Sequence, residues 1–214
     1  MSLPVWLIIA IPIGIAIFYL YSNMDRERNK FHSIIVKCLG SFIPLSCTGL
    51  ALSLKSENPL ANLVFWFMIL CVIADAVREY TFVSGMLVFG LAHVLFVIWL
   101  IMQESVTYIN IIIWLAAVSV IFYIFRRMLK ARGIDALPFC VYILILTLIF
   151  SISLTLPFTH PPVYIPMAIG ALMLIASDLI SGTQINSRRV KFSKTVMFLY
   201  WGALHLISAA LWYL

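Results

Sequence analysis

Five ionisable side chains stand inside long apolar stretches of the sequence: Lys37, Asp75, His93, Asp178 and His205. A charge at the centre of a bilayer costs at least about 2.5 kcal/mol on insertion scales, so such residues usually face a protein interior or a polar cavity. Carboxyl and imidazole groups are also common proton-transfer groups in catalysis. These five positions are therefore the first candidates for a functional site.

The two aspartates are the strongest candidates for acid–base chemistry. A carboxyl group in a low-dielectric cavity is harder to ionise, a second carboxylate nearby adds to this effect, and a lysine opposes it. Asp75, Asp178 and Lys37 could together keep one carboxyl protonated and the other ionised. Such a pair supplies a general acid and a charge-stabilising base, as in hydrolysis through an oxocarbenium ion. Alternatively, each aspartate is a helix-end residue exposed to headgroup water.

Besides the two aspartates, five side chains could bind or orient a substrate, and each of the five could instead have a purely structural role. Lys37 could pair with an aspartate or hold a lipid phosphate, or its amine could reach the headgroup region. His93 and His205 could act in catalysis or hydrogen-bond between helices. Tyr142 and Tyr200 could donate into a cavity or lie at an interface.

The composition indicates what must hold these side chains. Of the 214 residues, 64% are hydrophobic and 10% are charged, and the mean hydropathy is +1.11. A soluble protein has about 45–50% apolar and about 25% charged residues. So few charges cannot cover a soluble domain of this size. The apolar runs are continuous rather than alternating, which argues against a membrane β-barrel. We therefore expect an all-α integral membrane protein.

Charges and turn residues divide the chain into eight apolar runs, each near the roughly 20 residues that a membrane-spanning helix needs. The sequence therefore predicts a polytopic protein with eight transmembrane helices, forming a single membrane domain over residues 1–214. The predicted spans are about 3–21, 33–54, 60–77, 82–102, 106–125, 136–156, 163–180 and 195–214.

The basic residues orient this bundle. The loops after the odd-numbered spans contain most of the lysines and arginines: Arg26, Arg28, Lys30, Arg78, Arg126, Arg127, Lys130, Arg132, Arg188, Arg189, Lys191 and Lys194. The positive-inside rule places these loops in the cytoplasm and both termini on the other side of the membrane. In a bacterium this would be the inner membrane. The net charge of +6 is explained by this topology, so we expect no nucleic-acid partner.

Spans three and four resemble spans seven and eight. Ile73-Ala74-Asp75 is matched by Ile175-Ala176-Ser177-Asp178, and Gly90-Leu91-Ala92-His93 is matched by Gly202-Ala203-Leu204-His205. Four helices per half give both copies the same orientation. The pattern therefore predicts a parallel 4+4 duplication about an axis along the membrane normal.

Other familiar sites have no signature in the sequence. The four cysteines, Cys38, Cys47, Cys71 and Cys140, lie inside apolar runs without CxxC spacing, so we expect packing thiols rather than a disulfide or a zinc site. The sequence contains no GxSxG, HExxH, P-loop or dinucleotide fingerprint. We expect no metal and no organic cofactor.

Several of these residues resemble the pattern of a known family, the YhhN-like proteins, which include lysoplasmalogenase (transmembrane protein 86). The pattern consists of Asp75 followed by Gly85, Phe89 and His93, Gly170-Ala171-Leu172 with Ser177-Asp178, Lys37 with Pro44, and Pro138 with Tyr142. The chain departs from it at Ala74, where the family usually has Gly, and at Met173 in a Phe-rich region. It also has Leu204-His205 where the family tends to have glutamine after alanine, with His205 a possible substitute.

The resemblance implies hydrolysis of the vinyl-ether bond of a lysoplasmalogen, a lysophospholipid in the bilayer, to a fatty aldehyde and glycerophosphoethanolamine or glycerophosphocholine. It implies Asp75 and Asp178 as the acid and base, in either order. Lys37 would bind phosphate or tune the aspartates, and His93, Tyr142, Tyr200 and His205 would bind or orient water or headgroup. The alternatives are a non-catalytic lysolipid-binding protein and a small-molecule transporter. A transporter would need a polar path to the outer face, yet the first and fifth spans and the outer halves of the second to fourth spans offer no ionisable group.

Overall fold

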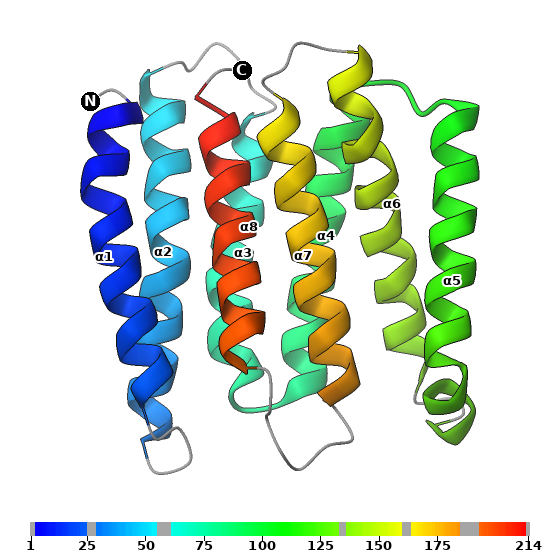
Figure 1. The fold of residues 1–214 in the computed structure, drawn as a ribbon, viewed down its shortest axis with the longest axis horizontal. Coiled ribbons are helices and arrows are strands. Elements are labelled where there is room, and N and C mark those ends of the chain that lie inside the picture. Colours follow the sequence, from blue (N-terminus) through cyan, green and yellow to red (C-terminus); the bar gives the residue numbers. More distant parts are fainter. Residues whose placement is uncertain are drawn as a thin grey trace.

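Eight α-helices make up the described part of the chain in the computed structural model (Figure 1). The structure describes residues 3–24, 29–54, 61–132, 136–159, 164–184 and 193–212, and no strand occurs in these ranges. The helices are α1 (Leu3–Asn23), α2 (Lys30–Leu54), α3 (Ala61–Arg78), α4 (Phe82–Gln103), α5 (Tyr108–Arg132), α6 (Leu137–Thr159), α7 (Tyr164–Gln184) and α8 (Ser193–Ala210).

The predicted all-α class is confirmed, and one helix occupies each predicted apolar run. Most helix ends lie within a few residues of the predicted ones, but α5 continues past residue 125 to Arg132 and carries its basic residues on this C-terminal extension. Six helices in the described ranges are long and apolar enough to cross a membrane, namely α1, α2, α4, α5, α6 and α7. The other two, α3 and α8, have 18 residues each, and their crossing stays a prediction.

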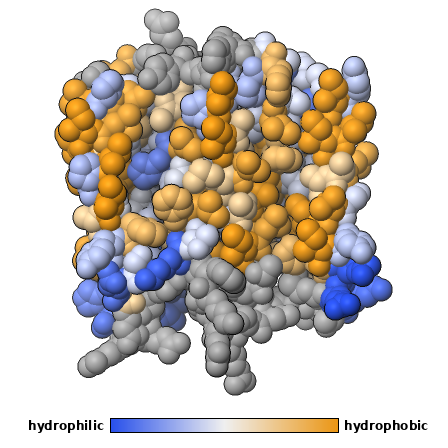
Figure 2. Space-filling model, in the orientation of Figure 1, coloured by the Kyte–Doolittle hydropathy of each residue, from blue (hydrophilic) through white to orange (hydrophobic). Residues whose placement is uncertain are grey.

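The outer surface of the bundle is apolar, as lipid contact requires. In Figure 2, hydrophobic residues cover most of the visible face, and hydrophilic ones gather toward its lower edge. The peripheral helices expose large aliphatic side chains, among them Ile8, Ile15, Ile112 and Ile124, each more than 60% exposed. Soluble proteins rarely expose apolar patches of this extent. The protein is therefore a membrane protein.

Six of the helices form a closed ring. Neighbours in this ring are α2, α3, α4, α6, α7 and α8, and α8 packs back against α2. Outside the ring, α1 packs against α2 and α8, and α5 packs against α6. The contacts of α1 with α2, of α2 with α3 and of α3 with α4 have counterparts four helices later, between α5 and α6, α6 and α7, and α7 and α8. The α4–α6 contact likewise corresponds to the α8–α2 contact, and only the α1–α8 contact has no counterpart among the described helix pairs. A 4+4 duplication requires this pattern, although the duplication itself stays a prediction.

Both ends of the described chain lie at the same end of the bundle, where α1 begins and α8 ends (Figure 1). Helices α1, α3, α5 and α7 end at the opposite end of the bundle, where Arg78 and Arg126 also stand. Which end faces the cytoplasm stays a prediction. Part of its basis lies outside the described residues: Arg26, Arg28, Arg188, Arg189 and Lys191.

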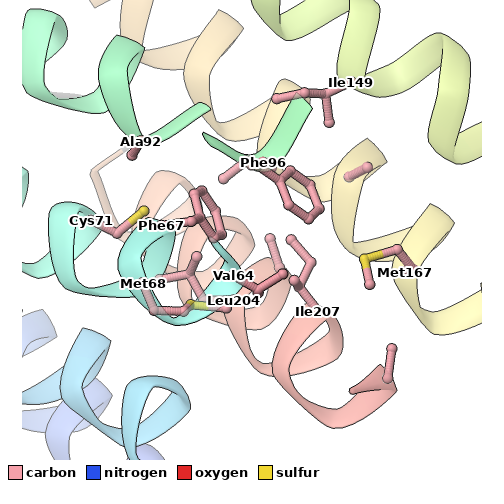
Figure 3. Close-up of a cluster of buried hydrophobic side chains, with 14 of the residues drawn as sticks. Val64, Phe67, Met68, Cys71, Ala92, Phe96, Ile149, Met167, Leu204 and Ile207 are labelled. Carbon is pink, nitrogen blue, oxygen red and sulfur yellow. The ribbon is translucent and has the colours of Figure 1, made fainter. Parts of the chain in front are cut away.

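An apolar core fills the ring on the side where α3 begins. Figure 3 shows Phe67 of α3 and Phe96 of α4 among aliphatic and sulfur side chains from the neighbouring helices. The two phenyl rings stack with centroids 4.8 Å apart, and both side chains are fully buried. Asp75 lies two turns further along α3, toward the other end of the bundle. The ionisable groups Lys37, Asp75 and Asp178 thus lie beyond this core, toward the end of the bundle where α3 and α7 end.

Hydrogen bonds attach the peripheral helix α5 to the ring. The Asn110 side-chain amide donates to the Ser151 carbonyl at 3.2 Å and to the Thr155 hydroxyl at 2.5 Å, and the Ser151 hydroxyl donates to the Asn110 carbonyl at 2.7 Å. The Trp114 indole donates to the Leu144 carbonyl at 3.1 Å. Such bonds replace the hydrophobic effect, which gives little drive for helix association in lipid.

The ring closes where Gly40 of α2 meets Trp201 of α8. A Cβ atom on Gly40 would lie 2.3 Å from the Trp201 ring. That ring is itself held edge-on against Tyr21, at 5.7 Å between centroids, and Phe18, at 6.3 Å. Since α1 packs behind the indole, the indole cannot retreat without disturbing α1.

Gly40→Ala is therefore expected to destabilise the protein by about 1–3 kcal/mol, because overpacking forces side chains off their rotamers. Thermal unfolding of the detergent-solubilised protein measures this. The matched control is Gly14→Ala on α1, where the nearest atom, Ile43 Cδ1, is 4.0 Å from the added Cβ. This control should gain up to about 1 kcal/mol from helix propensity. Equal melting temperatures for the two variants would contradict a ring closed at Gly40.

Candidate functional site

Asp75 lies in the last turn of α3, inside the ring, with 4% of its surface exposed. The Ser41 hydroxyl on the neighbouring helix α2 donates a hydrogen bond to its Oδ2 atom. Ser41 itself is fully buried. A buried carboxyl group is costly unless it is hydrogen-bonded, and this serine supplies a partner from across the helix interface.

Asp178 has a corresponding arrangement on α7. The Tyr142 hydroxyl on α6 donates to its Oδ2 atom at 2.5 Å. Thus each aspartate is held by a hydroxyl group from the helix that precedes its own in the chain, α2 for α3 and α6 for α7. The two predicted repeats share this arrangement but use different donors, a serine in the first and a tyrosine in the second.

Lys37 stands one turn before Ser41 on α2, and its amine forms an ion pair with Glu79, in the turn after α3. The amine also lies 5.9 Å from the centroid of the Tyr21 ring and interacts electrostatically with Asp75. The structure therefore brings Lys37 close to the first aspartate, while its direct partner is a glutamate that the sequence analysis did not consider.

His93 is fully buried on α4 beside the second aspartate. Its ring contacts those of Phe67, Phe89 and Tyr142, with centroids 5.5–6.3 Å apart, and it interacts electrostatically with Asp178. Its Nδ1 atom lies 2.6 Å from the Phe89 carbonyl oxygen. Because a carbonyl only accepts, Nδ1 carries the proton, and the neutral ring presents Nε2 as an acceptor. Nε2 has no partner among the described residues.

Tyr200 of α8 faces the first aspartate. Its side chain is 4% exposed, and its ring meets Phe89 edge-on at 5.6 Å between centroids. The hydroxyl group interacts electrostatically with Asp75 and Ser41, although within the described ranges it makes no hydrogen bond of good geometry. A buried phenol without such a bond can bind a water molecule or a ligand.

His205 lies on another side of α8. It follows Tyr200 by five residues, which rotates it by about 140° around the helix. Its Nδ1 atom lies 2.7 Å from the Trp201 carbonyl oxygen, and its ring centroid is 6.2 Å from that of Trp6 on α1. The structure thus brings Lys37, Asp75, His93, Tyr142, Asp178 and Tyr200 into the ring interior and directs His205 toward α1.

A small pocket, partly open to the outside, borders Asp178. Its walls come from the end of α3 and from α4, α6 and α7, and they consist of Arg78, Met86, Phe89, Phe139, Tyr142, Asp178, Ser181 and Gly182. Arg78 interacts electrostatically with both aspartates, so the two carboxyl groups share one electrostatic environment. Gly85 allows this arrangement, since a Cβ atom there would lie 2.6 Å from Arg78 Cα.

Three polar residues of this site were not identified from the sequence: Ser41, Arg78 and Ser181. Arg78 is three residues after Asp75, so the two share a helix face. The sequence places Arg78 in a short predicted loop, where it serves only to orient the bundle by the positive-inside rule. Ser41 follows Lys37 by four residues and also shares its face. Serines are common at helix contacts in membranes, and this one carried no further signal.

The arrangement is suited to proton transfer in a nearly dry environment. One end of the ring interior holds the carboxyl groups of Asp75 and Asp178, each with a hydroxyl donor. The His93 imidazole and the Arg78 guanidinium group lie at the same end. Within the described residues no group of three His, Cys, Asp or Glu side chains could hold a metal ion. The four cysteines are free thiols. Carboxyl and imidazole side chains can transfer protons.

Comparisons with known proteins place the chain in a family. The model of the YhhN family matches residues 32–211, from α2 to the end of α8. No curated protein and no solved structure matches the chain. The matched segment contains the six ring helices, both aspartates and all the pocket residues. The chain therefore belongs to the YhhN family.

Proposed function

We propose that this protein is a lysoplasmalogenase-type hydrolase, which cleaves the vinyl-ether bond of a lysoplasmalogen within the membrane. The products are a fatty aldehyde and glycerophosphoethanolamine or glycerophosphocholine. The observation that carries the proposal is the pair of aspartates inside the helical ring, each of which accepts a hydrogen bond from a hydroxyl group and interacts electrostatically with Arg78. Membership of the YhhN family supports the same reaction class.

The reaction needs one acid and one base. A protonated carboxyl group gives its proton to the vinyl carbon farther from oxygen, which leaves an oxocarbenium ion. A carboxylate stabilises this cation and accepts a proton from the water that attacks it. The resulting hemiacetal collapses to the aldehyde and the free glycerol hydroxyl. Asp75 and Asp178 divide these two roles, and the net reaction consumes one water.

Two polar groups remain to position the attacking water. The Nε2 atom of His93 accepts a hydrogen bond, and the Tyr200 hydroxyl can donate one. Both atoms are buried and have no hydrogen-bond partner in the described part of the chain. The rings of both residues contact that of Phe89, at 6.3 Å and 5.6 Å between centroids. His93 interacts electrostatically with Asp178 and Tyr200 with Asp75, so each could hold a water next to one of the aspartates.

The division of the interior favours hydrolysis over transport. A carrier needs polar groups along a path to both faces of the membrane. Here an apolar core surrounds Phe67 and Phe96 (Figure 3), and the buried polar residues beyond it, such as Thr48, Ser153 and Ser208, carry uncharged hydroxyl groups. The site lies at the bundle end that carries Arg78 and Arg126. By the positive-inside rule, we propose that this end faces the cytoplasm.

The first test is aldehyde release from lysoplasmenylethanolamine by the purified, detergent-solubilised protein. Asp75→Asn and Asp178→Asn should each lower the rate at least about a hundredfold, because general acid–base groups contribute that much or more. Glu104→Gln is the matched control. It also neutralises a carboxylate, but it lies after the far end of α4 and should keep wild-type activity.

Full activity in both aspartate variants would remove these residues from the mechanism while leaving the reaction class in place. Binding of the lipid by the folded wild type without any aldehyde would instead favour the non-catalytic lysolipid-binding protein. Thermal unfolding of each variant separates a chemical effect from loss of the fold.

The second test follows the proton. In D₂O, transfer from an acid to the vinyl carbon should place one deuterium at C2 of the released aldehyde, and the rate should fall. Mass spectrometry of the trapped aldehyde measures the label. Aldehyde formed in D₂O without deuterium at C2 would exclude protonation of carbon and with it the oxocarbenium route. Preformed aldehyde incubated with the protein in D₂O controls for exchange.

A further inference from the structure

The mouth of the pocket contains two side chains that the reaction itself does not use. Arg78 ends α3 and Ser181 is on α7, and both line the pocket with Asp178. Ser181 is 7% exposed, and its hydroxyl has no hydrogen-bond partner among the residues that the structure describes. A buried hydroxyl without a partner, on the wall of a pocket that also holds a guanidinium group, indicates a missing polar ligand.

We infer that Arg78 and Ser181 bind the phosphodiester group of the lysophospholipid and so make the enzyme selective for phosphorylated ether lipids. This inference rests on the proposed function and adds the recognition site for the headgroup. An arginine guanidinium forms bidentate, charge-assisted hydrogen bonds with phosphate oxygens, and a serine hydroxyl can donate a further one.

The helix register places this group at the right depth. Arg78 follows Asp75 by three residues and Ser181 follows Asp178 by three, and α3 and α7 run toward the same end of the bundle (Figure 1). Three residues advance a helix by about 4.5 Å. A phosphate bound at the level of Arg78 and Ser181 is therefore separated from the level of the two carboxyl groups by about the length of a glycerol backbone. The vinyl ether, on the far end of that glycerol, then lies between the two aspartates.

The remaining walls suit the same ligand. Met86, Phe89 and Phe139 provide apolar contacts for the glycerol and the first carbons of the chain. Gly182 leaves room at the mouth, since a Cβ atom there would approach Phe139 to 3.1 Å. Apolar walls also lower the local dielectric constant and strengthen the attraction between guanidinium and phosphate. Lys37, in contrast, is not among the residues that line this pocket, and it is ion-paired with Glu79.

Binding rather than turnover tests the inference. The probes are an alkyl-ether lysophosphoethanolamine, which has no vinyl bond to cleave, and the same alkylglycerol without phosphate. Wild type should bind the phospholipid at least about tenfold more tightly than the alkylglycerol, as expected for charge-assisted hydrogen bonds. Arg78→Gln should abolish the preference by weakening only phospholipid binding. Arg78→Lys should retain part of it, and Ser181→Ala should reduce it several-fold.

The matched control is Arg126→Gln. Arg126 is exposed on α5 at the same end of the bundle, with its guanidinium 4.3 Å from the centroid of the Tyr123 ring. It should keep the wild-type preference, which separates a specific contact from the general positive potential of this end. Inorganic phosphate at equal concentration should displace the lipid poorly, since it lacks the apolar chain. Strong displacement would assign the site to free phosphate and overturn the inference.

An unchanged preference in Arg78→Gln would also overturn it. Wild-type affinity for the alkylglycerol shows that a variant is folded, and if Arg78→Gln fails this criterion, Ser181→Ala decides the question. Because neither probe is cleaved, the result is independent of the aldehyde assay. Absence of aldehyde would refute the proposed function alone, whereas absence of phosphate selectivity would refute this inference alone.

Discussion

The cost of burying two carboxyl groups inside a helical bundle determines much of this structure. Each group needs a hydrogen-bond donor that does not come from solvent, because the apolar ring excludes most water. The donors are Ser41 for Asp75 and Tyr142 for Asp178. Each of these bonds joins two helices that are consecutive in the chain. The two carboxyl groups therefore also help to fix the order of the ring, and a ring that opened would expose both of them to lipid.

The two halves share a plan but differ at the site. Contacts between helices follow the same order in both, which accounts for the matching depth of the aspartates. The side chains around them differ, since a small serine holds the first carboxyl group and a large tyrosine the second. The pocket described above opens beside Asp178, whereas Asp75 is more deeply enclosed. Two similar carboxyl groups in unlike surroundings are a common basis for dividing the roles of acid and base.

The sequence predicts helix positions well because a span is a property of a continuous segment. Each apolar run found by hydropathy contains one helix. The difference between the predicted and observed helix end is largest in α5, because Arg126 and Arg127 end the apolar run but not the helix. Side-chain partners depend on helix rotation and on contacts distant in sequence. The Lys37–Glu79 pair and the orientation of His205 toward Trp6 are of this kind. The residues near each partner in a single sequence do not indicate such long-range contacts.

The described residues that line the pocket all come from the half of the ring where α3 and α7 end, and the apolar core around Phe67 and Phe96 lies beyond them. If the proposed substrate reaches Asp178 through this pocket, it enters from the adjacent half of the bilayer, and its products return to that same half. Lipids of the opposite monolayer would have to be flipped by another protein before they reached the aspartates. The position of this pocket would thus connect the proposed hydrolysis to one monolayer and to the lipid asymmetry of the membrane.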